Sequence, residues 1–171
     1  MGGDFYSHSG GIAHLSAVRA IMEGTDPRCH TTSCRDGRCS LPLENAPKPM
    51  ALINLEHEAA PVGHEEPRSD FLFVGGHTTD TEWVAPIELT ASSARVSKFL
   101  PQLRAGAEIA SRLIPREHRV RFRPIAAYGG ELRRTERDSF LKKANYVSFR
   151  NKPTPVKLIR CGSPLVKAFA G

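Results

Sequence analysis

The sequence lacks the marks of several large protein classes. No apolar run approaches the roughly 18 to 20 residues that span a bilayer, and the first residues show no basic segment followed by an apolar one, as a secretory signal would. There is no Walker phosphate loop, no GxGxxG after a strand and no GxSxG. We therefore expect a cytoplasmic protein with no membrane partner, outside the P-loop, dinucleotide-binding and nucleophile-elbow classes.

Composition points to a folded, basic protein. The 171 residues are 40% hydrophobic and 25% charged, which suits one globular domain with a core. The formal net charge is +6 and the pI about 9.4, a balance that favours polyanions such as DNA or RNA as partners.

Four cysteines are present, and in the cytoplasm they are expected to be reduced thiols or metal ligands. Cys29, Cys34 and Cys39 are separated by four residues each, and Cys161 lies far along the chain. Together they could hold Zn²⁺ or an iron–sulfur cluster as thiolates. The gaps are wider than in zinc knuckles, so free, partly buried thiols remain the alternative.

The chain divides at residue 50. Residues 1–49 are rich in Gly, Ser, His, Cys and Pro and predict an irregular N-terminal arm with one short helix over 12–22. Residues 50–171 predict an α/β domain, and its expected elements are strands over 50–55, 70–74 (stopped by Gly75-Gly76), 82–89 and 120–126, helices over 94–114 and 131–143, and a closing hairpin of 146–150 with 156–160.

This order of elements predicts a mixed sheet flanked by helices. Strands 70–74 and 82–89 are joined by a short loop and should pair as an antiparallel hairpin. The following helix and the strand over 120–126 imply a right-handed parallel crossover. Pro101 should kink that helix or mark a later start, and Ser92 or Ser93 could cap it.

Two carboxylates stand where chemistry could arise. Asp70 opens one strand and Glu88 lies near the end of the next, so the two side chains can converge across the hairpin if their faces agree. Converging carboxylates suit Mg²⁺, which could activate water beside a phosphate. The alternatives are that Asp70 is a solvated turn residue and that Glu88 is exposed on an edge strand, where Pro86 would also belong.

Asp70, then Glu88-Leu89-Thr90 on the next strand, then a helix carrying Gln102, resembles the PD-(D/E)xK nuclease superfamily. The resemblance covers about residues 50–126 and implies a restriction-endonuclease-like core. It further implies a metal held by Asp70 and Glu88, with another glutamate from the first core helix, for which Glu56 or Glu58 is the nearest candidate. Gln102 matches the functional glutamine of some subfamilies, or is simply a polar residue near the helix start.

The sequence departs from this family at two places. Thr90 stands where the family has its lysine, and Ser69 stands where it has a proline before the first acid. A threonine hydroxyl cannot supply the charge of an ammonium group. Lys98, about one turn into the helix, could replace the missing amine, as a migrated lysine does in some family members. Otherwise the domain binds without cleaving.

The second half of the chain is basic. Arg119, Arg121 and Arg123 alternate with apolar residues and are predicted to share one strand face that tracks a nucleic-acid backbone. A solvated charged face is the alternative. We therefore expect a nucleic-acid-associated PD-(D/E)xK-like protein, an Mg²⁺-dependent nuclease with an altered site. The alternatives are a non-catalytic structural or interaction protein that retains the fold, and a cysteine-based metal-binding module.

Overall fold

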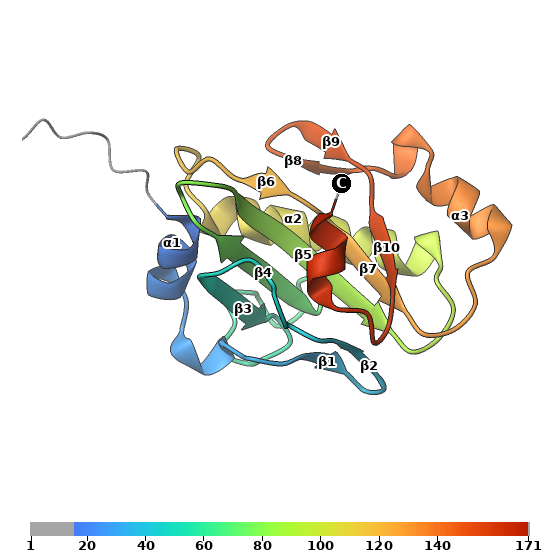
Figure 1. Ribbon diagram of the computed structural model, residues 1–171, viewed down its shortest axis with the longest axis horizontal. Helices are drawn as coiled ribbons and strands as arrows, with labels where there is room; N and C mark the ends of the chain where they lie inside the picture. The colour runs from blue at the N-terminus through green and yellow to red at the C-terminus, as the bar shows by residue number, and fades with distance from the viewer. Residues whose placement is uncertain (1–15, 171) are drawn as a thin grey trace, which may run out of the picture.

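A computed structural model describes residues 16–170 (Figure 1). Its helices are α1 (Ala17–Gly24), α2 (Val96–Leu113) and α3 (Arg134–Phe140), with the 3₁₀ turns η1 (Pro27–Cys29), η2 (Lys143–Asn145) and η3 (Leu165–Phe169). Its strands are β1 (Cys34–Asp36), β2 (Cys39–Leu41), β3 (Met50–Asn54), β4 (Phe71–Gly76), β5 (Glu82–Thr90), β6 (Arg121–Phe122), β7 (Ile125–Tyr128), β8 (Val147–Phe149), β9 (Lys152–Thr154) and β10 (Lys157–Arg160).

A mixed sheet forms the centre of the molecule. Its strand order is β10-β7-β5-β4-β3, and β6 pairs with the beginning of β5. Strands β3, β4 and β5 pair antiparallel, whereas β7 and β10 join in parallel. At the centre of this register Ile87 lies opposite Phe71 on one side and Ile125 on the other. The predicted α/β class, with a mixed sheet flanked by helices, is confirmed.

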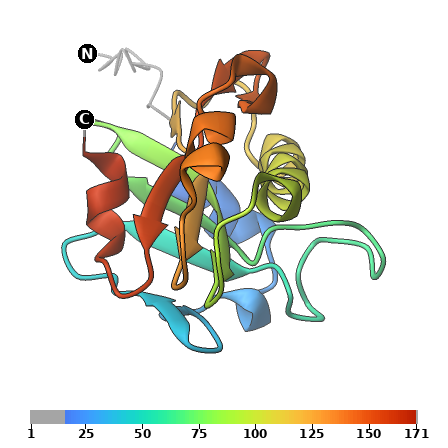
Figure 2. The same cartoon turned by 90° about the vertical axis from the view of Figure 1, so that its right-hand side faces the viewer.

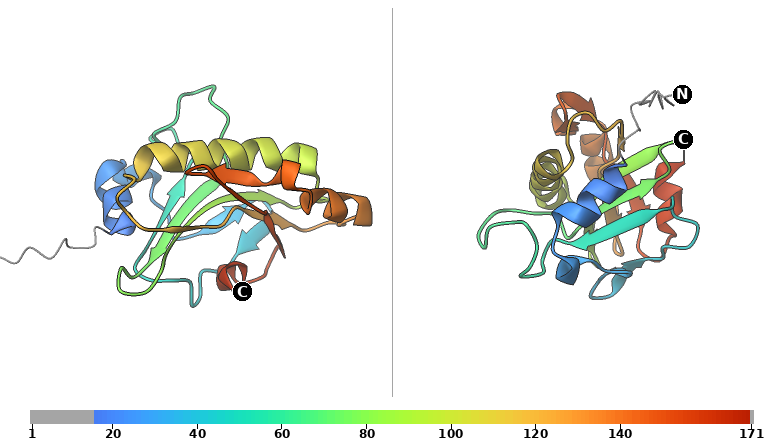
Figure 3. Two further views of the ribbon diagram at one scale, coloured as in Figure 1. Left: turned by 90° about the horizontal axis from the view of Figure 1, so that it is seen from above. Right: turned by 90° about the vertical axis from the view of Figure 1, so that its left-hand side faces the viewer.

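Two layers cover the sheet. Helix α2 lies along one face, and η3 lies on the other (Figures 2 and 3). Alternation along β5 sends Val84 toward Ile109 of α2, while Ile87 packs in a separate cluster with Leu165 of η3. The α2 face is the one on which Glu88 also falls. Among residues 16–170, no helix combines the length and apolar character needed to cross a bilayer.

The predicted N-terminal arm is more ordered than expected and contributes to the core. Ile21 of α1 and Cys39 of β2 are fully buried, each in one of the two clusters that sandwich the sheet. Glu82, only 3% exposed, accepts the backbone N–H groups of Ala17 and Val18, both at 3.1 Å, and so satisfies the first turn of α1. The beginning of the predicted helix over 12–22 lies outside the described residues.

Strands β4 and β5 differ from expectation in ways that matter for Glu88. Strand β4 continues through Gly75 and Gly76, which were expected to stop it. Strand β5 is central, so the alternative of an exposed edge position for Glu88 is wrong. Pro86 is tolerated there because it lies opposite the interruption between β6 and β7.

The C-terminal third was predicted with the wrong pairing. The expected strand over 120–126 is split into β6 and β7, and the helix expected over 131–143 is limited to α3. The closing hairpin is β8 with β9, whereas β10 joins the central sheet beside β7. Local alternation does not specify which strand a segment pairs with, because the partner is selected by tertiary contacts.

Helix α2 runs through Pro101 without interruption and begins after Arg95, not at the serines. Its first N–H group is satisfied from outside the segment, since the Val96 N–H donates to Glu136 Oε2 at 2.9 Å. Ser92 instead bonds with Thr90, its hydroxyl lying 2.8 Å from the Thr90 hydroxyl. The predicted serine cap is therefore wrong.

The cysteines also depart from expectation. Cys39 and Cys161 form a disulfide, while Cys29 and Cys34 are free and buried. The expectation that all four are reduced is wrong for this pair. The bond connects β2 to the segment that follows β10.

Reducing the Cys39–Cys161 bond is expected to lower the free energy of unfolding by about 2–4 kcal/mol, because the bond closes a long loop and restricts the unfolded chain. The linked residues are 122 positions apart. Urea unfolding with and without reductant measures the effect. A double Cys39→Ser/Cys161→Ser variant serves as control and should not respond to reductant. Identical midpoints for the oxidised and reduced wild type would contradict the prediction.

Candidate active site at the end of β5

Asp70 and Glu88 come together at the end of the β4–β5 pair. The Asp70 N–H donates to Glu88 Oε2 at 3.0 Å, and the Leu89 N–H donates to Asp70 Oδ2 at 2.8 Å. Each carboxylate thus receives a backbone donor from the neighbouring chain segment, which fixes the position of both. The predicted convergence of the two side chains is confirmed.

Burial makes this pair electrostatically unusual. Burial is the largest of the causes that raise the pKa of Asp70 and of Glu88 above the ordinary range of carboxyl groups. The charge of Asp70 further raises the pKa of Glu88, and Glu56 raises the pKa of both. Two carboxyls held in this way favour retention of a shared proton, or the approach of a cation.

Lys98 reaches the same site from the first turn of α2. Its Nζ donates to Thr90 Oγ1 at 2.8 Å. Thr90 lies two residues after Glu88 on the same strand, so the Lys98 amine is held at the position where the PD-(D/E)xK motif has a lysine and this chain has Thr90. The Lys98 charge acts on Glu88 and opposes the rise of its pKa. Helix α2 therefore brings a positive charge to a place where the strand provides none.

Glu56 and Gln102, both predicted from the sequence, line one cavity of about 360 Å³ between the β3–β4 loop and α2. Glu56 acts electrostatically on Asp70 and Glu88. Glu58, the other candidate glutamate, acts on Arg28 instead. Of the two glutamates left open by the sequence, Glu56 is the one whose charge acts on the carboxylate pair, but within residues 16–170 it does not complete a three-carboxylate metal site with Asp70 and Glu88.

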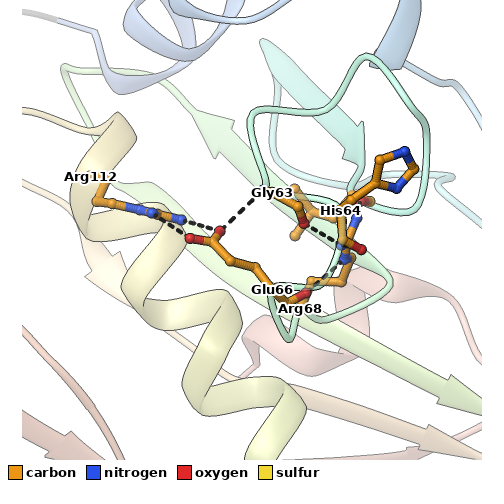
Figure 4. Close-up of polar contacts among 6 residues, drawn as sticks. Gly63, His64, Glu66, Arg68 and Arg112 are labelled. Atoms are coloured by element: carbon orange, nitrogen blue, oxygen red, sulfur yellow. Dashed lines mark hydrogen bonds and ion pairs between the residues drawn. The ribbon is translucent and has the colours of Figure 1, made fainter.

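The loop that forms the outer wall of this cavity is fastened by arginines (Figure 4). Arg112 of α2 donates to both carboxylate oxygens of Glu66, at 3.2 and 3.1 Å. Arg68 donates to the carbonyls of Gly63 and His64, at 2.7 and 3.0 Å. Paired donors of this kind fix geometry as well as charge, so the wall is held in place against α2.

Sequence reasoning missed Asp36. This residue of β1 raises the pKa of Asp70 through its charge, although it lies 34 positions away in the chain. Its only sequence signal was the Asp36-Gly37 turn, which predicts a bend and nothing more. The approach of Asp36 to the site depends on how the β1–β2 hairpin packs, which no local pattern specifies.

The predicted thiolate site is not formed. Cys39 and Cys161 are consumed in their disulfide, and burial raises the pKa of the Cys34 thiol to about 12 and that of Cys29 above its usual value. A thiol that keeps its proton is a poor ligand for Zn²⁺. In the described part of the chain, no group of three or more His, Cys, Asp or Glu side chains is arranged to hold a metal ion.

The three predicted arginines do not share one strand. Strand β6 begins at Arg121, so Arg119 precedes it and is exposed. Arg121 and Arg123 lie together over the ring of Trp83, with their guanidinium carbons 5.0 and 5.1 Å from its centroid. The predicted strand over 120–126 is interrupted between β6 and β7, which is why Arg123 lies outside both strands.

Comparison with models of protein families, with curated proteins and with solved structures finds no match to this chain.

Gly106 sets how closely α2 approaches the site. A Cβ atom at this position would collide with the Ser69 hydroxyl and with the Pro86 ring. Gly106→Ala is therefore expected to lower the free energy of unfolding by about 1–3 kcal/mol through overpacking. Thermal unfolding measures this. Ser111→Ala, which also introduces alanine but at an exposed position of α2, is the comparison and should not lower stability. A Gly106→Ala protein as stable as the wild type would contradict the close approach of α2 to Ser69 and Pro86.

Proposed function

We propose that this chain is a PD-(D/E)xK-like nuclease that hydrolyses phosphodiester bonds of DNA or RNA with Mg²⁺ at Asp70 and Glu88. The observation that carries the proposal is the three-part arrangement at the end of β5. A buried carboxylate, Glu88, and a half-buried one, Asp70, are held by backbone donors, and the amine of Lys98 is bonded to Thr90 at the end of the same strand. Such a grouping of opposite charges is typical of catalytic sites.

The order of elements supports a restriction-endonuclease-like core. In the family an acidic residue, the (D/E)xK strand and a following helix occur in this chain order. Here Asp70 precedes β4, Glu88 lies on β5, and α2 then leads to β7, which pairs in parallel with β5. With this order of elements, α2 begins shortly after the end of β5 that carries Glu88, and Lys98 lies in its first turn.

The donor set fits Mg²⁺, an ion that proteins commonly bind through one or two carboxylates together with water and substrate phosphates. Asp70 and Glu88 would be its protein ligands, and a cation there would relieve the repulsion that raises the pKa of Glu88. When bound, Mg²⁺ supplies Lewis-acid polarisation of the phosphate and lowers the pKa of coordinated water.

The remaining side chains have separate tasks. Lys98 places a fixed positive charge where negative charge grows on the phosphate during attack, and Thr90 holds its amine in that position. Gln102, from the next turn of α2, offers an amide to orient a phosphate oxygen or a water in the cavity beside Glu56. The proposed location of the protein is the cytoplasm, where the Cys39–Cys161 bond would be subject to reduction.

The proposal is tested by incubating the full chain with single-stranded DNA, duplex DNA and RNA in Mg²⁺ or in EDTA. We expect Mg²⁺-dependent cleavage of at least one substrate that Glu88→Ala abolishes. Binding without cleavage at every divalent concentration would reject the nuclease and favour the non-catalytic alternative, for which the replacement of the family lysine by Thr90 is the supporting observation. Cleavage that survives Glu88→Ala would contradict the assignment of Glu88 as a metal ligand.

A further inference from the structure

A second cavity lies toward the beginning of β5, away from the carboxylates. It has a volume of about 560 Å³ and is lined by residues of β6, the β8–β9 hairpin and the start of β10. Five cations line it: Arg121, Arg123, Arg150, Lys152 and Lys157. Among the residues that the structure describes, no Asp or Glu contributes to its wall. The cavity therefore carries an excess of positive charge.

The fold holds these cations in place. Arg121 and Arg123 are both stacked on Trp83, and burial, together with the charge of Arg121, lowers the pKa of Arg123. The Arg150 guanidinium lies over Phe149, 5.0 Å from the ring centroid, and donates to the His118 carbonyl at 2.6 Å. Like charges that packing keeps close together create a lasting positive potential, which an anion would relieve.

Apart from Thr154, the rest of the wall is apolar. Val120, Phe122, Phe149, Pro153 and Val156 face the same space. A ligand that matches both halves has an anionic group and a flat, weakly polar body, as a nucleotide has in its phosphate and base. The volume lies within the range of small-ligand sites, so an unpaired nucleotide can enter and a base-paired duplex cannot.

We propose that this cavity binds unpaired nucleotides of a nucleic-acid strand, through their phosphates and a base. The inference rests on the proposed function in one respect, namely that the strand bound here is the one cleaved at Glu88. Glu88 lies five positions after Trp83, a rise of about 17 Å along β5, and alternation puts the two side chains on opposite faces of the sheet. A nucleic acid that reaches from this cavity to Glu88 must therefore bend around the sheet, which a flexible single strand can do and a stiff duplex cannot, so single-stranded nucleic acid is the substrate class.

Trp83 lines the cavity and is the only tryptophan of the chain, so its emission reports occupancy directly. The full chain is titrated in EDTA with oligothymidylate, a duplex of equal length, thymidine monophosphate and inorganic phosphate. Fluorescence anisotropy of labelled oligonucleotide is followed in parallel. We expect saturable change in Trp83 emission with oligothymidylate, about tenfold tighter than with the monophosphate because several phosphates are engaged.

Lys152→Glu/Lys157→Glu should weaken oligothymidylate binding at least about tenfold. The control is Lys142→Glu/Lys143→Glu, which makes the same charge change at two exposed residues outside the cavity and should have a minor effect. Thermal midpoints establish that both variants are folded.

Three outcomes would overturn the inference: equal weakening by the two variants, oligonucleotide binding that leaves Trp83 emission unchanged, or saturation by the monophosphate as tight as by the oligonucleotide. The last would indicate a free-nucleotide site. These titrations need no metal and no cleavage, so the Trp83 response does not depend on whether Asp70 and Glu88 hold Mg²⁺. If the protein proves not to be a nuclease, the binding measurements at this cavity can still be interpreted. If the cavity proves not to bind oligonucleotides, the cleavage assay still tests the nuclease proposal.

Discussion

Replacing Lys98 with Met is expected to lower the rate of Mg²⁺-dependent cleavage about 10²–10³-fold, equivalent to ~2.7–4 kcal/mol of transition-state stabilisation. The methionine keeps the length and apolar stem of the side chain but removes the charge that lies 2.8 Å from Thr90 Oγ1. Single-turnover cleavage assays at saturating protein measure the chemical step. Binding of Mg²⁺, followed by calorimetry, should be little changed because Asp70 and Glu88 remain.

The same charge can be supplied from the strand. In the double variant Thr90→Lys/Lys98→Met, the lysine occupies the position two residues after Glu88, where PD-(D/E)xK nucleases carry it. We expect this double variant to cleave at least about tenfold faster than Lys98→Met. Lys143→Met, an equivalent change at an exposed lysine far from β5, is the control and should cleave normally. Full activity in Lys98→Met would show that the amine has no role in catalysis.

Glu88→Gln is expected to abolish cleavage, by about a thousandfold or more, and at the same time to stabilise the fold. The activity is lost because an amide is a weak ligand for a hard cation. The stability is gained because burial and the charge of Asp70 disfavour the ionised Glu88, and glutamine removes that charge. At mildly alkaline pH we expect a gain of ~1–3 kcal/mol in the free energy of unfolding.

The direction of the pH dependence follows from the raised pKa values of Asp70 and Glu88. The unfolded chain releases these protons near pH 4, whereas the folded protein retains them to higher pH. Over that interval the native state binds more protons than the unfolded state, so the free energy of unfolding falls as pH rises from about 4 through neutrality.

Urea unfolding across this range, with and without Mg²⁺, measures the effect. The decrease in the free energy of unfolding as pH rises should be smaller in Glu88→Gln. In the wild type, Mg²⁺ should offset this decrease. Glu23→Gln is the matched control, because Glu23 is exposed and pairs only with Arg19 one turn away. If wild type and Glu88→Gln show the same pH profile, the carboxylates do not share a buried site.

Much of the site was predictable because its residues lie at strand and helix ends that local patterns identify. Alternation along β5 put Glu88 on one face, and the short β4–β5 connection brought Asp70 opposite, so hairpin geometry alone was enough to bring the pair together. The helical period placed Lys98 within the first turn after the same strand. Each of these inferences needs only neighbours in the chain.

Other features required contacts between distant segments. The sequence did not identify Asp36 as a neighbour of Asp70, nor Glu136 as the cap of α2, since each partner comes from another part of the chain. It also failed to choose between Glu56 and Glu58, two exposed glutamates with the same local surroundings.

By itself, the sequence determined the α/β class, the antiparallel hairpin that carries Asp70 and Glu88, and the position of α2 directly after it. Only the tertiary structure decided that β5 is central, that Cys39 bonds to Cys161, that Lys98 reaches Thr90, and that a basic cavity forms beside Trp83. The physical reason is the range of the forces involved. Periodicity records which face of an element is buried, but the partner that buries it is selected by packing over the whole chain.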